Sequence, residues 1–298
     1  MLKKRYKEIL LVIIFLAFIV YAFSLWSFAG IVSKSDARII IRDFERAYLY
    51  QEVLNNSEYE NQRGKIMSGF FTSKKELENL FNIAFKASGD QESKIFVTDV
   101  LRGLVAKSKI ETLKFEKKVI NGVAYVKINV FNDKLIPKYE KALEEYHTKY
   151  SKLILDLRGA AYGEIEVASG VADDLLGNGK EICTLDGEVK SSIINSDVFY
   201  YKFDKIYVLL DKNSGVPSEI IALSLKKGLG DKVTLIGSST LQTSTACTDK
   251  KYSVHFDTSI ASYKWSVGGD TSSAVQRYLA PYSMVKLETL DDYIEQIK

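Results

Sequence analysis

The chain has 298 residues, 46% of them hydrophobic and 27% charged, which is enough for one large hydrophobic core or two modest ones. Residues 1–8 carry four basic side chains and one acidic one, and this accounts for the whole formal net charge of +3. The remaining chain is neutral and has no basic tract, which argues against nucleic acid as a partner.

Residues 9–32 contain no charged side chain and are mostly aliphatic or aromatic. As a helix this run reaches roughly 36 Å, enough to cross a hydrocarbon core of about 30 Å. The basic residues ahead of it predict a cytoplasmic tail (1–8), a transmembrane signal anchor (9–32) and an extracytoplasmic globular part, in a single-pass protein of the cell membrane. A cleaved signal peptide is the alternative, because Ser27-Phe28-Ala29 has the small residues that a signal peptidase needs.

Residues 33–110 are predicted to form a helical N-terminal region. One helix is expected over 37–55, and a second follows Ser73, which has Glu76 three residues later in the spacing of a capping box. A third is expected through 97–105. The polar stretch 55–69 is predicted to be a surface connection.

Residues 111–298 are predicted to form an α/β domain. Asn121-Gly122 indicates a hairpin turn between strands at 113–120 and 123–131, since both residues tolerate positive φ. Short apolar strands then alternate with helices, which is typical of a mainly parallel sheet. The expected elements are helices at 137–149, 164–176 and 217–229, and strands at 152–157, 181–185, 206–210 and 233–236.

The chain has two cysteines, Cys183 and Cys247, both in the α/β domain. An oxidising compartment would permit a disulfide between them, although sequence alone does not show that they approach each other. Two thiols and two histidines give no metal-ligand spacing, so neither a metal nor a cofactor is predicted.

In parallel sheets, functional groups gather where strands end and helices begin. Two such junctions occur here, at 153–163 and 208–222, and each has a glycine-containing turn after a buried strand. Backbone N–H groups in such turns can converge on an anion or a polarised carbonyl.

These junctions resemble the core of the tail-specific, or C-terminal processing, serine proteases. Residues 153–163 resemble that family's Leu-Ile-Leu-Asp-Leu-Arg-Asn-Asn-Pro-Gly-Gly, and residues 213–220 resemble its Gly-Ser-Ala-Ser-Ala-Ser-Glu-Ile. Residues 235–240 are similar to its following strand and turn, and the resemblance covers roughly 113–270. It implies a crotonase-like α/β fold and peptide cleavage by a serine activated by a neutral lysine.

The residues at the implied catalytic positions are not those of an active peptidase. The family's nucleophile position corresponds to Val216, and its lysine position to Thr243. A valine cannot attack a carbonyl, and a threonine is no general base at neutral pH. These substitutions predict a pseudoprotease.

The implied oxyanion turn and cleft also depart from the family pattern. Tyr162 replaces the first of two glycines and Gly163 is the second, while the Asn-Asn-Pro ahead of them is Gly159-Ala160-Ala161. Gly215 and Pro217 flank Val216 on the other side of the expected cleft.

Ser218 and Ser214 are the fallback nucleophiles, because each lies two residues from the family position. A thiol pair of Cys247 with His255 is weaker, since these residues are merely near each other in sequence. Many family members also insert a PDZ domain of about 80–90 residues that captures substrates. Residues 86–112 are too few to hold one, so this chain is predicted to lack that domain.

The sequence thus favours a membrane-anchored, catalytically inactive homologue that binds or scaffolds a peptide or an active partner protease. One alternative is an active serine peptidase with a relocated nucleophile. A second alternative is a structural ectodomain of a membrane complex.

Overall fold

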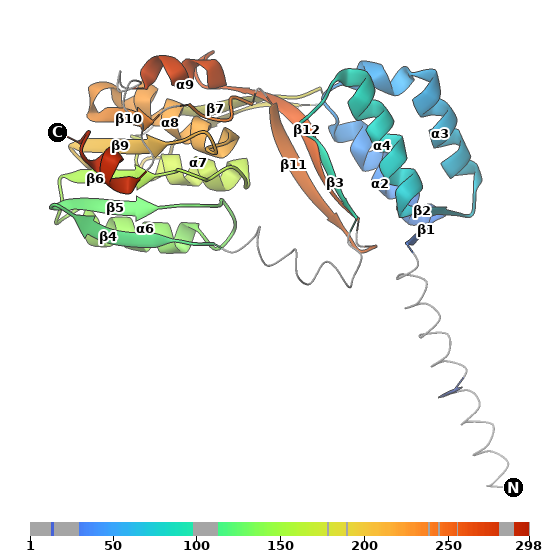
Figure 1. Cartoon of the computed structure of the whole chain (residues 1–298), viewed down its shortest axis with the longest axis horizontal. Coiled ribbons are helices and arrows are strands. Elements are labelled where there is room, and N and C mark those ends of the chain that lie inside the picture. Colours follow the sequence, from blue (N-terminus) through green and yellow to red (C-terminus); the bar gives the residue numbers. More distant parts are fainter. Residues whose placement is uncertain are drawn as a thin grey trace, which may run out of the picture. The chain divides into compact units, whose positions relative to one another are not determined.

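The computed structural model describes residues 13–14, 30–97, 113–177, 179–188, 190–237, 239–243, 245–254, 256–279 and 289–297. The chain divides into two compact units, both visible in Figure 1. Unit 1 comprises residues 1–107 and 249–260, and unit 2 comprises residues 108–248 and 261–298.

Unit 1 is built from helices with a short β-ribbon at one end. Its elements before the α/β domain are β1 (Ile31–Ser33), α2 (Lys34–Ala47), the 3-10 helix η1 (Gln51–Asn55), α3 (Ser57–Ser68), β2 (Phe71–Ser73), α4 (Lys74–Ser88) and β3 (Lys94–Val97). Strands β1 and β2 pair antiparallel, and β3 pairs with the first part of β12 (Phe256–Ser266).

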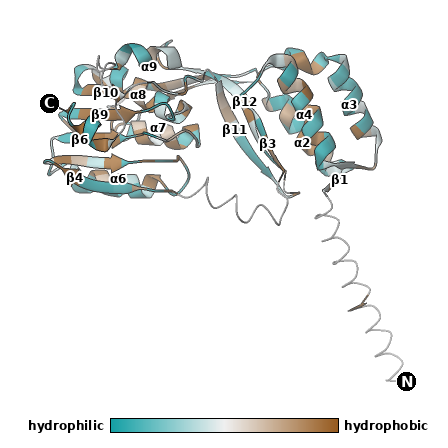
Figure 2. Cartoon of the chain, viewed as in Figure 1, coloured by the Kyte–Doolittle hydropathy of each residue, from teal (hydrophilic) through white to brown (hydrophobic). Residues whose placement is uncertain are grey.

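The helices of unit 1 are amphipathic and enclose an aromatic core. Figure 2 shows hydrophobic and hydrophilic residues along both α2 and α4. The Phe44 and Phe81 rings stack with their centroids 4.1 Å apart, and both side chains are buried. Burial of such rings provides most of the stabilisation of helices this short.

The capping box predicted at Ser73 and Glu76 is confirmed. The Ser73 hydroxyl accepts the Glu76 N–H at 3.1 Å, and the Glu76 carboxylate accepts the Ser73 N–H at 2.7 Å. Two of the N–H groups that a helix start leaves unsatisfied are thereby bonded.

Three expectations for unit 1 are corrected. The helix expected over 37–55 is divided into α2 and η1, because Tyr48 after α2 is extended. The stretch predicted as a surface connection forms α3, which Asn56 caps and which buries Tyr59 and Ile66. Only two of its side chains face the core, so the periodic signal was too weak to indicate a helix. Val97 ends a strand rather than lying in a third helix, and the rest of that expected helix lies outside the described residues.

The main sheet of unit 2 has the order β10-β9-β6-β5-β4. Its strands are β4 (Glu116–Ile120), β5 (Val123–Lys127), β6 (Lys152–Asp156), β9 (Lys205–Leu210) and β10 (Val233–Gly237). Neighbours from β5 to β10 are parallel, and only β4 is antiparallel. The predicted mainly parallel α/β sheet is confirmed.

The Asn121-Gly122 hairpin is also confirmed. Asn121 has φ 51° and Gly122 has φ 79°, so both adopt the left-handed conformation that joins β4 to β5. Asparagine and glycine are the residues that accept this conformation at least cost.

The two faces of this sheet are covered differently. Alternate residues of β6 and β9 pack against α6 (Ile136–Tyr146), α7 (Ile165–Asp173) and α8 (Val216–Leu229) in one large cluster. The intervening residues form a smaller cluster with α10 (Leu290–Ile294) on the other face. This period of two places buried side chains on both faces, which explains the continuous apolar strands.

Several elements of unit 2 were not predicted. They are β8 (Ser191–Asn195), which pairs antiparallel with the predicted β7 (Glu181–Asp186), together with α9 (Ser272–Tyr278) and α10. Strands β11 (Thr245–Tyr252) and β12 were also missed, and each contributes residues to both units.

The predicted transmembrane segment falls almost entirely outside the described residues. Among the residues that are described, no helix has the length and apolar character needed to cross a membrane. Ile31 and Val32, at the end of the predicted span, belong to strand β1 of unit 1, where Val32 is fully buried.

Candidate functional site

The two junctions identified in the sequence lie at one edge of the main sheet. Strands β6, β9 and β10 are parallel neighbours, so their carboxyl ends lie side by side. The turns 157–163 and 211–215 and the segment 239–243 follow these ends. This is the edge at which sheets of this type place their binding groups.

Hydrogen bonds hold the first two turns together. The Gly215 N–H donates to the Ala160 carbonyl at 3.1 Å, and the Ser214 hydroxyl donates to the Leu157 carbonyl at 2.9 Å. A Cβ on Gly215 would lie 2.2 Å from the Ala161 carbonyl oxygen, so only glycine permits this approach.

Asp211 organises the same region and was not singled out in the sequence. Its Oδ1 atom accepts the N–H groups of Gly159 and Asn213, each at 3.0 Å. The second contact is an Asx turn, which an aspartate ahead of Asn-Ser-Gly could have indicated.

The segment after β10 contacts the start of α8 at two points. The Leu241 N–H donates to the Ser214 carbonyl at 2.9 Å, and the Gln242 N–H donates to the Glu219 carboxylate at 2.9 Å. Ser214 precedes Val216 in the chain and Glu219 follows it. The segment that leads into Thr243 is therefore hydrogen-bonded to residues on both sides of Val216. The Thr243 carbonyl accepts the Trp265 indole N–H at 3.0 Å.

Val216 is the first residue of α8 and lies in the large core cluster, with only 8% of its surface exposed. Pro217 follows it in the first helical turn, where the missing N–H costs no helical hydrogen bond. The residue predicted to occupy the family's nucleophile position is therefore an aliphatic side chain packed into the core.

Both fallback serines are fully buried. The Ser218 hydroxyl donates to the Ala160 carbonyl at 2.7 Å, and the Ser214 hydroxyl donates to the Leu157 carbonyl. Buried hydroxyls bonded to backbone carbonyls join segments, whereas a nucleophile must be reached by its substrate and deprotonated by a base.

The turn after β6 contains Tyr162 and Gly163, two of the residues predicted to form the oxyanion turn, and they differ in what they contact. Gly163 has φ 136°, and a Cβ there would lie 2.3 Å from the Phe131 carbonyl oxygen. The Phe131 N–H donates to the Tyr162 carbonyl at 3.2 Å, so the turn is fixed against the strand-end segment at Phe131. The Tyr162 side chain is 59% exposed, and Gly159 adopts φ 76°.

A buried ion pair supports this turn from within. Asp156 is fully buried, accepts two hydrogen bonds from the Arg158 guanidinium at 2.8 and 2.6 Å, and accepts the Tyr125 hydroxyl at 2.6 Å. Burial acts to lower the pKa of Arg158, but hydrogen bonding and the charge of Asp156 outweigh it and raise that pKa. Burial and then the charge of Asp156 raise the pKa of Tyr125. The pair fixes the strand end rather than supplying a titrating group.

The disulfide that the sequence would permit is not formed between Cys183 and Cys247. Cys183 lies on β7 within the large core cluster, where burial raises the pKa of its thiol to about 11. Among the described residues, no group of three or more His, Cys, Asp or Glu side chains is placed to hold a metal ion.

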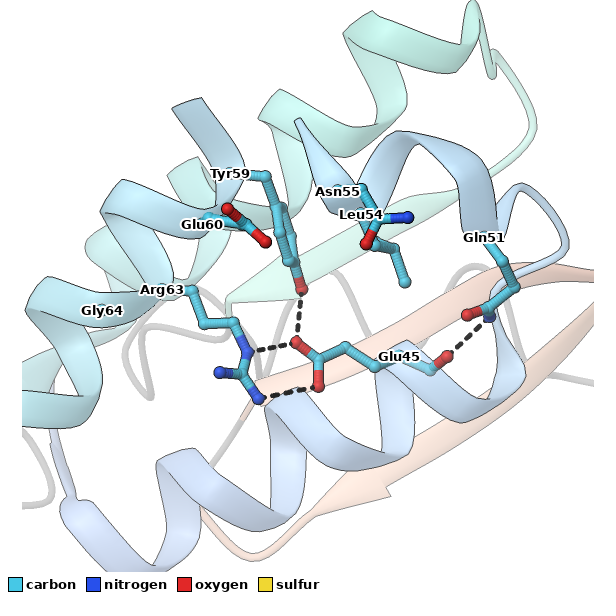
Figure 3. A pocket seen from close by; sticks show the side chains of 8 residues that line it. All are labelled: Glu45, Gln51, Leu54, Asn55, Tyr59, Glu60, Arg63 and Gly64. Carbon is cyan, nitrogen blue, oxygen red and sulfur yellow. Dashed lines mark hydrogen bonds and ion pairs between the residues drawn. The ribbon is translucent and has the colours of Figure 1, made fainter. Parts of the chain in front are cut away.

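A separate pocket of about 440 Å³ lies in unit 1 and was not predicted (Figure 3). The Glu45 carboxylate accepts the Arg63 Nε and Nη2 at 2.5 and 3.2 Å, and the Tyr59 hydroxyl donates to it at 3.2 Å. The Gln51 amide donates to the backbone carbonyl of Glu45 at 2.6 Å. Within this lining Arg63 forms an ion pair with Glu45, and Glu60 adds a second carboxylate. The bonds of Glu45 join α2 to η1 and α3.

Unit 2 is a mixed α/β fold, and comparisons with known proteins relate it to one family. Residues 122–264 match the model of Peptidase family S41. This part of the chain is therefore homologous to the S41 family, to which the tail-specific and C-terminal processing proteases belong. No curated protein matches the sequence significantly.

Two solved structures have a similar fold. A lipoprotein from Streptococcus agalactiae is 15% identical with a TM-score of 0.58, over 78% of this chain and 85% of that one. A photosystem II D1 C-terminal processing protease is 12% identical with a TM-score of 0.57, over 82% of this chain and 90% of that one.

Proposed function

We propose that this chain is a membrane-anchored, extracytoplasmic S41 homologue that binds a peptide or a protein partner without cleaving it. The observation that carries the proposal is Val216, an aliphatic residue packed into the core at the family's nucleophile position. Thr243 at the lysine position supports the same conclusion, because it cannot serve as a base at neutral pH.

The fold at the strand ends is retained although its chemistry is absent. Six backbone and side-chain hydrogen bonds join the segments around Val216, and glycines stand where close backbone approach requires them. A crotonase-like scaffold that keeps this geometry can present backbone groups to an extended peptide, since fold and catalysis are separable.

Burial of the neighbouring serines disfavours a relocated nucleophile. Ser214 and Ser218 are both inaccessible, and each donates its hydroxyl to a backbone carbonyl. An active peptidase would have to break these bonds and expose a side chain from the helix start.

The catalytic proposal is tested with a serine-directed fluorophosphonate probe and unstructured peptides with apolar C-termini, on the purified full chain in detergent. We expect neither labelling nor cleavage. Labelling that Ser218→Ala or Ser214→Ala abolishes would overturn the proposal in favour of a relocated nucleophile. The double variant Val216→Ser with Thr243→Lys tests whether introducing a serine and a lysine at these positions produces peptide cleavage.

The binding proposal is tested by crosslinking from intact membranes followed by purification of the chain. We expect a reproducible peptide or protein partner, and we expect replacement of the exposed Tyr162 side chain to reduce its capture. Recovery of the chain alone would favour a purely structural ectodomain.

The topology is tested with tags at each end of the chain in cells stripped of their outer layers. Added protease should remove the C-terminal tag and spare the N-terminal one. A protected C-terminal tag would contradict the orientation predicted from the basic residues at 3–7.

A further inference from the structure

One end of unit 1 carries a cluster of exposed apolar side chains, which we call the apolar edge: Ile31, Phe70 and Phe71. Their exposed fractions are 36%, 83% and 53%. Exposed phenylalanines next to each other in the chain are costly in water unless another surface covers them.

The apolar edge follows from the β-ribbon. Strands β1 and β2 pair with Val32 opposite Thr72, and these two side chains are buried. Strand residues alternate between faces, so Ile31 and Phe71 lie on the opposite face of the ribbon from that buried pair. The ribbon therefore buries one face in unit 1 and exposes an apolar one.

The ribbon is also the place where the N-terminal apolar run joins unit 1. The Lys74 N–H donates to the Gly30 carbonyl at 2.7 Å, which ties the residue before β1 to the start of α4. The uncharged residues 9–30 precede this point, and as a helix they would reach about 33 Å, still enough to span a hydrocarbon core.

Basic side chains belong to the same end of unit 1. Lys34 has its Nζ 5.9 Å from the centre of the Phe70 ring, while Lys65 and Lys75 are exposed in the adjoining turns of α3 and α4. Two carboxylates near this end are hydrogen-bonded at helix starts, since Asp36 accepts the Ser33 hydroxyl and Glu76 accepts the Ser73 N–H. Aromatic rings beside lysines suit the interface of a bilayer, where lipid phosphates meet acyl chains.

From this placement we propose that the apolar edge lies against the membrane, with its phenylalanines at headgroup depth and the adjoining lysines on lipid phosphates. The occupant of this surface is thus a lipid bilayer containing anionic lipid. The proposal rests on the membrane anchor proposed above, and it adds that unit 1 itself contacts the membrane surface.

The test uses the full chain reconstituted into vesicles of phosphatidylcholine and phosphatidylglycerol, with brominated acyl chains as the quencher. Phe70→Trp places a reporter on the apolar edge. Glu52→Trp is the matched control, exposed in η1 beyond the far end of α2, a helix about 21 Å long. The parent chain, whose two tryptophans are Trp26 and Trp265, gives the baseline.

We expect the Phe70→Trp signal above baseline to shift to the blue and to lose most of its intensity with brominated lipid. The Glu52→Trp signal should do neither. Equal, unquenched signals from both variants would overturn the proposal. An edge covered by a protein partner rather than by lipid would give this result.

Resistance of the chain to carbonate extraction tests the anchor independently. Extraction-resistant protein with an unquenched Phe70→Trp signal refutes the membrane contact and leaves the anchor standing. Extractable protein with a quenched signal refutes the anchor and leaves the contact standing. Extractable protein without quenching refutes both.

Discussion

The Ser218 hydroxyl donates a 2.7 Å hydrogen bond to the Ala160 carbonyl and so ties the first turn of α8 to the turn after β6. The same carbonyl accepts the Gly215 N–H at 3.1 Å. Ser218 is therefore a structural link between the two junctions that the sequence singled out.

Replacing Ser218 by alanine should destabilise unit 2 by about 1–2 kcal/mol, because a buried hydrogen bond between distant segments is lost. Denaturant unfolding followed by fluorescence of Trp265, which is buried in unit 2, measures the change. Ser224→Ala is the control, since the Ser224 hydroxyl is also buried but donates to the Ile221 carbonyl within the same helix. Equal effects of the two substitutions would contradict the linking role.

Gly163, in the turn after β6, should tolerate no side chain. Gly163→Ala should cost about 3 kcal/mol or more, because its Cβ would lie 2.3 Å from a backbone oxygen at a φ of 136°. Gly64 lies inside α3 with nothing within 4 Å of an added Cβ. Gly64→Ala should therefore stabilise the chain by about 0.5–1 kcal/mol.

Thermal unfolding followed by circular dichroism compares these two variants. The melting temperature should fall for Gly163→Ala and rise for Gly64→Ala. A mild effect at Gly163 would mean that the segment at Phe131 does not approach the turn as closely as the structure indicates.

Tyr293 should be the main contact of α10 with the sheet. Its ring lies 4.4 Å from the Arg158 guanidinium, its hydroxyl donates to the Leu210 carbonyl at 3.2 Å, and it is buried in the smaller cluster. Tyr293→Ala should cost about 3–5 kcal/mol and Tyr293→Phe about 1 kcal/mol. Hydrogen exchange of β9 measures the loss of cover, and unchanged protection in Tyr293→Ala would show that α10 contributes little.

Asp174 should make the stability of unit 2 depend on pH. Burial, followed by the charges of Glu140, Asp173 and Asp197, raises the Asp174 pKa from 3.8 to about 7. Its Oδ2 atom is buried and accepts no hydrogen bond from the described residues. A raised folded-state pKa means that the folded chain holds the proton more tightly, so the stability that Asp174 contributes is fully present below about pH 4 and is lost as pH rises through about 7.

The Asp174→Asn variant should lose much of this pH dependence. Allowing for partial solvent screening, the difference from the parent between pH 5 and 8 should be on the order of 1–2 kcal/mol. Unfolding at several pH values measures it, with Asp231→Asn as the control substitution at an exposed aspartate. A parent whose stability is flat over this range would disprove the assignment to Asp174.

Sequence alone determined the elements whose signals are local. The apolar runs of β6 and β9, the Asn121-Gly122 turn and the Ser73–Glu76 capping box each depend on neighbouring residues, and the structure has them where they were predicted. The order of the junctions likewise indicated the S41 fold, because strand, glycine turn and helix follow one another within short segments.

Only the tertiary structure determined which distant segments contact one another and which side chains those contacts bury. It buries Ser214 and Ser218 by bonding them to carbonyls about 60 residues away in the chain, and it leaves Cys183 and Cys247 without a disulfide. Helix α3 escaped prediction because only two of its side chains are buried. Strands β11 and β12 escaped it because polar residues such as Thr245 and Thr258 occupy buried positions, so the sequence shows no clear apolar alternation. Burial, hydrogen bonding across turns and close backbone approach are set by three-dimensional contacts, and no local pattern encodes them.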